Sequence, residues 1–102
     1  MDVNVAVFGF LRFPPGSIPA IRPFLDEFVR ATKIHDGCIA YDVAEDLNEP
    51  GLLRFSELWP DRRSLDAHLS APHITPWREA AREHGLLERH FIAYDVSGAR
   101  TV

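Results

Sequence analysis

The chain has 102 residues, of which 46% are hydrophobic and 25% charged, so it can build one small core and is too apolar to be disordered. Its formal net charge of -4 argues against a general electrostatic affinity for nucleic acid. The single cysteine, Cys38, excludes an internal disulfide scaffold, and no apolar run approaches the roughly 20 residues of a membrane helix. We expect residues 1–102 to form a single cytoplasmic domain without a signal peptide.

The first half of the sequence predicts a strand, a helix and a second strand. Residues 3–13 (VNVAVFGFLRF) are β-branched and aromatic, and both alternating sets are largely apolar, which is typical of a strand covered on both faces. After a Pro-Pro-Gly turn, Ser17 is a candidate cap for a helix that ends at Asp36-Gly37, where glycine suits the left-handed position. Residues 38–44 (CIAYDVA) then predict the second strand.

The second half predicts a strand, an interrupted helical region and a last strand. Residues 52–59 (LLRFSELW) read as the third strand, and Asp61 is a plausible cap for the helix that follows. A Ser-Ala-Pro break at residues 70–72 separates this helix from the next, and residues 86–96 supply the fourth strand.

The resulting order, β-α-β-β-α-β, predicts an α+β protein of the ferredoxin-like type with an antiparallel sheet. The five residues 39–43 (IAYDV) recur letter for letter as residues 92–96, in the second strand of each βα half. Five residues are too few to establish an internal duplication, because shared strand chemistry can also produce them.

The apolar residues of the strands bear on assembly. Helices can cover only one face of a four-stranded sheet, yet the first and third strands are apolar on both faces. The sequence therefore predicts that the second face meets an identical sheet in a two-fold homodimer. The alternative is a monomer with an unusually apolar exposed sheet.

The first candidate for chemistry is a carboxylate on the third strand. Phe55, Glu57 and Trp59 share one face of that strand, because side chains alternate with period two. Burial of this face would raise the affinity of Glu57 for a proton, which suits a general acid or base or a hydrogen-bonding anchor. The alternative is a structural glutamate tied to a backbone amide or to Arg54 or Arg78.

Two histidines and a tryptophan follow on the helices. His68 lies on the helical stripe that should face the sheet, where an imidazole can move a proton near neutral pH without a metal. The alternative is a core histidine bonded to a carbonyl. His73 begins the next helix, whose dipole disfavours its charged form, so it is either a neutral donor or a cap or rim group. Trp77, one turn later, either lines a pocket or belongs to the core.

Motifs for metals and bound cofactors are missing. His68 and His73 are five residues apart with a proline between them, and the sequence has neither an HExxH nor a CxxC pattern, so we expect no zinc site. It also lacks a P-loop, a GxGxxG loop and a GxSxG nucleophile elbow. We therefore expect neither a metal nor a cofactor.

Several of these segments resemble the signature of the antibiotic biosynthesis monooxygenase (ABM) domains, E-x-W…l-x-A-H-L-x-x-P-H, and are most similar to the small quinol monooxygenases. The resemblance covers nearly the whole chain in order and length. The segments that carry it are Glu57-Leu58-Trp59, Leu65-Asp66-Ala67-His68-Leu69, Pro72-His73, and Gly37-Cys38 with Tyr41, which resembles the G-C-x-x-Y at the family's second strand.

The resemblance implies a ferredoxin-like protomer in a dimeric α/β barrel, with a pocket between helices and sheet. It also implies oxidation of a small aromatic substrate by molecular oxygen without metal, flavin or other prosthetic group. Trp59 matches a pocket tryptophan of polyketide-modifying members, but their asparagine and tyrosine are replaced here by Phe55 and Leu65.

The heme-degrading members have a tryptophan and a histidine where this chain has His68 and Arg78. The resemblance therefore favours the quinol-type pattern with His68 and His73 over anthrone oxidation or heme degradation. The family also contains isomerases of small phosphorylated diketones.

We assign His68 as the catalytic base and Glu57 as its orienting partner or a substrate anchor. A deprotonated hydroquinone can itself pass an electron to oxygen, so the protein must supply a base, an aromatic slot and exclusion of water. The same parts could shuttle a proton in an isomerase, or hold a small aromatic in a non-enzymatic binding module. The expected substrate-binding residues are Phe55, Trp59, His73 and Trp77.

Overall fold

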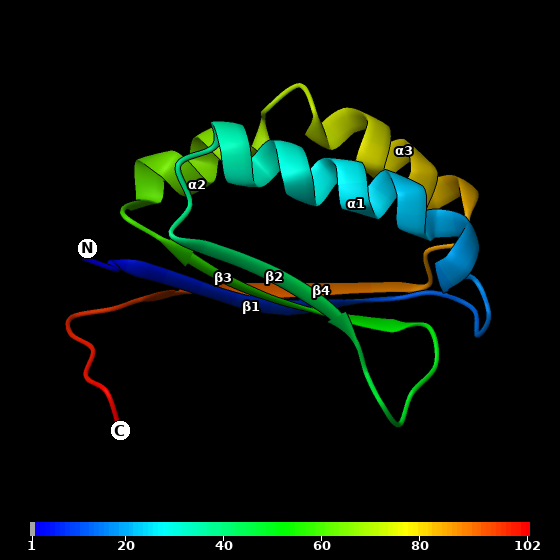
Figure 1. Cartoon of the computed structure of the whole chain (residues 1–102), viewed down its shortest axis with the longest axis horizontal. Coiled ribbons are helices and arrows are strands. Elements are labelled where there is room, and N and C mark those ends of the chain that lie inside the picture. Colours follow the sequence, from blue (N-terminus) through cyan, green and yellow to red (C-terminus); the bar gives the residue numbers. More distant parts are fainter. Residues whose placement is uncertain (1) are drawn as a thin grey trace.

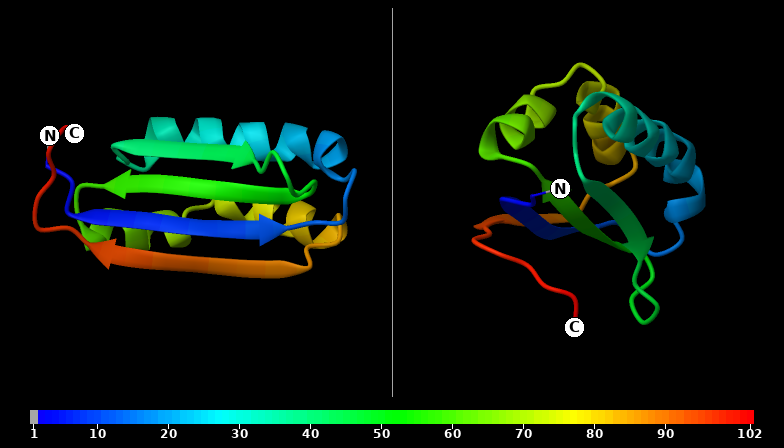
Figure 2. Two further views of the ribbon diagram at one scale, coloured as in Figure 1. Left: turned by 90° about the horizontal axis from the view of Figure 1, so that it is seen from below. Right: turned by 60° about the vertical axis from the view of Figure 1, so that its left-hand side comes forward.

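A computed structural model describes residues 2–102, which form one antiparallel four-stranded sheet with three helices on one of its faces (Figure 1). Its elements are β1 (Val5–Arg12), α1 (Ile18–His35), β2 (Ala40–Glu45), β3 (Leu52–Trp59), α2 (Arg62–Leu69), α3 (Ile74–Glu83) and β4 (Glu88–Asp95). The strands lie in the order β2-β3-β1-β4 (Figure 2, left). The predicted ferredoxin-like order is confirmed, with the second helical region divided at the predicted break. Within residues 2–102, no helix combines the length and apolar character that crossing a bilayer requires.

Strand pairing sets the strand ends. The predicted third strand agrees with β3, and all eight residues of β1 pair with it, from Val5 opposite Trp59 to Arg12 opposite Leu52. β1 is therefore shorter than the predicted span 3–13, which extends beyond the partner strand. β2 begins at Ala40 instead of residue 38, because the chain is still turning after the helix.

The caps of two helices differ in how they form. Asp61 accepts a hydrogen bond from the backbone N–H of Ser64 at 2.7 Å, which confirms the predicted cap of α2. Ser17 precedes α1 as expected, but its hydroxyl donates to the carbonyl oxygen of Pro14 at 2.6 Å and caps no helical N–H. The first turn of α1 contains a proline, which has no N–H to be capped.

The end of α1 positions a residue of the site. Asp36 is the C-cap, and its backbone N–H donates to the carbonyl oxygen of Thr32 at 3.0 Å. Gly37 follows with φ of 74°, the left-handed conformation in which glycine is favoured. The turn ends the helix there and leaves the Asp36 side chain beside α2 and α3.

The core lies between the helices and the inner face of the sheet. Gly9 in β1 pairs with Phe55 on one side and Phe91 on the other, and a Cβ atom at Gly9 would collide with the Phe91 ring. Because glycine has no side chain, the two rings pack edge to face across β1, with centroids 5.2 Å apart. The largest fully buried side chains are Trp59, Phe13, Ile21, Leu52, Leu53 and Thr32.

The opposite face of the sheet carries exposed apolar side chains, and the helices lie behind it in the left view of Figure 2. Phe8, Ile92 and Tyr94 are 52%, 42% and 49% exposed. The centroids of the Phe8 and Tyr94 rings lie 6.1 Å apart. The predicted apolar character of both sheet faces is confirmed.

Candidate active site

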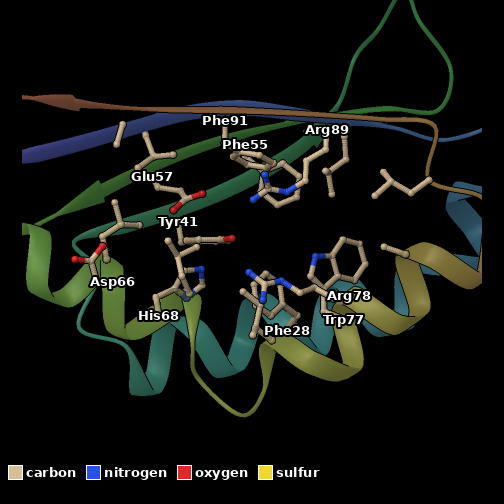
Figure 3. Close-up of a pocket in the computed structure, with 18 of the residues that line it drawn as sticks. Phe28, Tyr41, Phe55, Glu57, Asp66, His68, Trp77, Arg78, Arg89 and Phe91 are labelled. Carbon is tan, nitrogen blue, oxygen red and sulfur yellow. The ribbon is translucent and has the colours of Figure 1, made fainter.

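A cavity of about 650 Å³ lies between the inner face of the sheet and the three helices (Figure 3). This volume is in the range of sites that bind small molecules. Most of its wall is apolar or aromatic, and its polar members gather from β3, α2, α3 and β4. The lining residues used below are Phe28, Tyr41, Phe55, Glu57, Arg62, Asp66, His68, Trp77, Arg78, Arg89 and Phe91.

His68 lies in this wall and is held by a carboxylate from another helix. Its Nδ1 lies 2.6 Å from Oδ2 of Asp36, and Nε2 of His73 lies 2.8 Å from the same oxygen. The side chains of His68 and Asp36 are only 3% and 7% exposed, so water hardly weakens their interaction. A carboxylate accepts hydrogen bonds only, and both imidazoles can therefore donate to it.

The contact with Asp36 fixes the tautomer of His68. With the proton on Nδ1 donated to Asp36, the other ring nitrogen, Nε2, carries a lone pair and can take up a proton. Burial lowers the pKa of His68 below its ordinary value, and the Asp36 carboxylate opposes that shift. His68 is therefore neutral and basic near pH 7, and Asp36 can stabilise the imidazolium that forms when it accepts a proton.

Glu57 is a buried carboxyl group on the β3 face that points at the cavity. Burial raises its pKa to about 7, while a hydrogen bond from Nε1 of Trp59 at 3.0 Å opposes the shift. The predicted rise in proton affinity is thus present. The suggested partners Arg54 and Arg78 are not its partners, since Arg54 lies on the outer face and pairs with Asp46 at 2.8 Å.

Aromatic rings form the walls between these groups. Phe28 of α1 and Trp77 of α3 stack with centroids 5.8 Å apart and planes 10° from parallel. Tyr41 of β2 lies edge-on to Phe28 and Phe55, and its hydroxyl points into the cavity (Figure 3). Burial raises the pKa of Tyr41 above its ordinary value, and the nearby Glu57 adds to this shift. The hydroxyl of Tyr41 therefore stays protonated and can donate to a ligand.

The expected site residues thus occupy two places. Phe55, Glu57, His68 and Trp77 line the cavity. Trp59 and His73 do not: Trp59 is fully buried behind the wall, 5.0 Å from the His68 ring, and His73 contacts Asp36. Each contacts a neighbouring polar group, Trp59 the carboxyl of Glu57 and His73 that of Asp36, and neither forms part of the cavity wall in this structure.

Asp36 is the site residue that the sequence did not reveal. As part of Asp36-Gly37 it is explained by the helix end alone, which concealed any second role. One signal was available, because a negative charge at the C-terminus of a helix is unfavourable against the helix dipole. It also follows that Asp36, and not Glu57, is the orienting partner of His68.

Asp36, His68 and His73 are also the group that comes nearest to a metal-binding set among residues 2–102, with one donor atom from each within 4.8 Å of the others. The spacing of His68 and His73 in the sequence does not reveal this convergence, because the third residue, Asp36, comes from another helix end. In this arrangement Oδ2 of Asp36 accepts a hydrogen bond from each imidazole, which accounts for the convergence without an ion.

Known proteins are similar to this chain in sequence and in fold. The sequence model of the antibiotic biosynthesis monooxygenase family matches residues 4–82. Rv0793 of Mycobacterium tuberculosis, provisionally named a monooxygenase, is 33% identical over 83 residues, which cover 81% of each protein. A crystal structure from Deinococcus radiodurans, provisionally named for the same family, is similar with a TM-score of 0.87 at 28% identity, over 96% of this chain and 97% of that one. The structure of Rv0793 gives 0.80 at 27% identity, over 95% and 98%.

The family match covers most of the chain, and the residues that carried the resemblance, from Gly37 to His73, lie inside it. These relatives are similar to this chain in sequence and in fold, and the similarity covers most of each protein. The chain belongs to the antibiotic biosynthesis monooxygenase family.

Proposed function

We propose that this protein is a cofactor-independent monooxygenase that oxidises a small quinol-like aromatic with molecular oxygen. The observation that carries the proposal is His68, oriented by Asp36, in the wall of an aromatic cavity beside the buried carboxyl of Glu57. This arrangement supplies a buried base and a slot for an aromatic ring.

In the proposed reaction, Nε2 of His68 takes a phenolic proton while the aromatic walls hold the ring. The phenolate passes one electron to oxygen, and the resulting semiquinone and superoxide recombine at a ring carbon. Cleavage of the O–O bond then gives a hydroxyquinone and water. One hydroquinone and one O₂ are consumed, one oxygen atom enters the ring, and the other leaves as water.

Two neighbouring groups suit the later steps. Glu57, with a pKa near 7, is partly protonated at neutral pH and can give a proton to the departing oxygen. The neutral hydroxyl of Tyr41 can donate to a substrate oxygen and so orient the ring.

The proposal predicts oxygen uptake with a panel of hydroquinones. We expect at least one member to give oxygen uptake above its autoxidation rate. The uptake should persist after dialysis against EDTA, with elemental analysis confirming that metal is absent. The product should contain one ¹⁸O atom when the reaction is run under ¹⁸O₂. Loss of uptake on removal of a stoichiometric metal would contradict cofactor independence. Ligand binding without uptake would contradict the oxygenase and favour an isomerase or a binding module.

We also propose that the exposed sheet face pairs with a second copy of the chain. Its support is the cluster of Phe8, Ile92 and Tyr94, since large apolar patches rarely stay exposed to water. Sedimentation equilibrium at micromolar concentration should give twice the chain mass, and Phe8→Glu should shift it toward the monomer. Phe24→Glu, on the exposed side of α1, is the control and should remain a dimer. A wild-type monomer would contradict the pairing.

We further propose a cytoplasmic location, in keeping with Cys38, whose thiol is unpaired.

A further inference from the structure

Two arginines extend into the cavity from opposite walls. Arg78 comes from α3 and Arg89 from β4, and both line the cavity. In Figure 3 their guanidinium groups approach the middle of the cavity from the helix side and the sheet side. Glu57, Asp66 and His68 lie together toward the α2 end. The cavity therefore has one end rich in acid and imidazole groups and another rich in arginine.

Among residues 2–102, no carboxylate lies within ion-pair distance of either arginine. The third arginine of the wall, Arg62, is paired with Asp95 at 3.3 Å. Glu88, which is adjacent to Arg89 in sequence, is bound to Arg12 at 3.0 Å on the other face of the sheet. In a chain whose acidic residues outnumber its basic ones by 15 to 11, this leaves the cavity arginines available for an anionic ligand.

An aromatic ring packs against Arg89, and a stacked aromatic pair lies beside Arg78 in the sequence and in the cavity wall. Cζ of Arg89 lies 5.0 Å from the centroid of the Phe91 ring, close enough for a cation–π interaction. Trp77, one residue before Arg78, stacks on Phe28 in the cavity wall. A planar ring between these walls would place a substituent on that ring beside the two guanidinium groups. Guanidinium groups bind carboxylates in a bidentate manner, which gives both affinity and orientation.

We propose that the substrate is a hydroxylated aromatic carboxylic acid, whose carboxylate is bound by Arg78 and Arg89 and whose phenolic hydroxyl faces His68. This inference rests on the proposed function and names the substrate class of the same site. It also gives the substrate one orientation, because a carboxylate at the other end would meet Asp66 and the ionised form of Glu57, and like charges repel.

The test uses calorimetry under anaerobic conditions to measure the binding of 2,5-dihydroxybenzoate and 2,5-dihydroxybenzamide. These two ligands share the ring and both hydroxyls. We expect the acid to bind at least about tenfold more tightly than the amide, since hydrogen bonds between charged groups are the stronger ones. Arg78→Gln and Arg89→Gln should each remove most of this preference, weakening the acid much more than the amide. The preference should also fall as salt rises, because both arginines are exposed to solvent.

Arg82→Gln is the matched control, because Arg82 lies one turn further along α3, is exposed and does not line the cavity. It should keep the full preference for the acid. Equal affinities in the wild-type protein, or a preference that survives both substitutions, would overturn the arginine site.

Binding without oxygen separates this inference from the function on which it rests. An acid preference that depends on both arginines, together with no oxygen uptake in air, would count against the monooxygenase alone. Oxidation of hydroquinones without any acid preference would count against the arginine site alone. If neither ligand binds, the arginine site is overturned, and oxygen uptake with the hydroquinone panel still decides the monooxygenase.

Discussion

Replacing His68 by glutamine is expected to lower turnover of a hydroquinone at least about tenfold, because positioned proton transfer typically contributes about 10²–10⁴-fold to rate. Glutamine keeps a hydrogen-bonding side chain of similar reach but cannot accept a proton at neutral pH. The variant should fold and bind substrate as before. Oxygen uptake per folded protein, with binding measured separately, gives the comparison.

Asp36→Asn tests the same proton transfer through Asp36, the residue that positions the His68 ring. An asparagine can donate its amide hydrogen to Nδ1 of His68, which moves the ring proton to Nε2 and removes the base. We expect a loss of turnover with little change in substrate affinity. His84→Gln is the control, since His84 bonds the carbonyl oxygen of Ala80 at 2.7 Å and does not line the cavity.

The opposite result is equally informative. If His68→Gln lowers the melting temperature but leaves turnover per folded protein intact, His68 is a core histidine and the base lies elsewhere. The pH profile adds a second check. Because burial lowers the pKa of His68, the acid limb of kcat/KM should lie below the ordinary histidine value.

Replacing Glu57 by glutamine is expected to stabilise the protein at pH 8 and to have little effect near pH 4. The pKa of Glu57 is about 7 in the folded protein against 4.5 for a free side chain, so the folded state binds the proton more tightly. The stability from this proton is fully present below pH 4.5 and is lost as the pH rises through about 7. At pH 8 the wild-type protein must bury a charge, and the variant should gain up to about 3 kcal/mol.

Urea unfolding of both proteins at pH 4, 6 and 8, at one protein concentration, measures this difference. Glu79→Gln, at an exposed position on α3, is the matched control and should show no such pH dependence. A constant difference between wild type and Glu57→Gln across the pH range would show that folding does not shift the pKa of Glu57, and would contradict the prediction.

The order of elements could be predicted from sequence because each element has a local signal. Residues 52–59 alternate with period two and end at Pro60, which removes an N–H from any further ladder. The Asp61 cap and the glycine after Asp36 are likewise local, since each depends on hydrogen bonds or backbone conformations within a few residues. Where the prediction extended too far, in the first strand, the limit came from the length of its partner.

Part of the site followed from the same periodicities. Strand alternation gave the shared face of Phe55, Glu57 and Trp59, and helical spacing placed His68 toward the sheet. Periodicity could not tell that Trp59 lies behind the cavity wall while Phe55 forms it. Both residues face the same layer, and the helices above that layer decide where space remains.

The sequence by itself determined the fold class, the faces of the strands and the side of the helix on which His68 lies, because each of these depends on neighbours in the chain. Only the tertiary structure brought Asp36 to His68 and His73, which are 32 and 37 residues away. It alone set Arg78 of α3 opposite Arg89 of β4. These contacts depend on how the helices lie over the sheet, which follows from the packing of the whole core and leaves no period in the sequence.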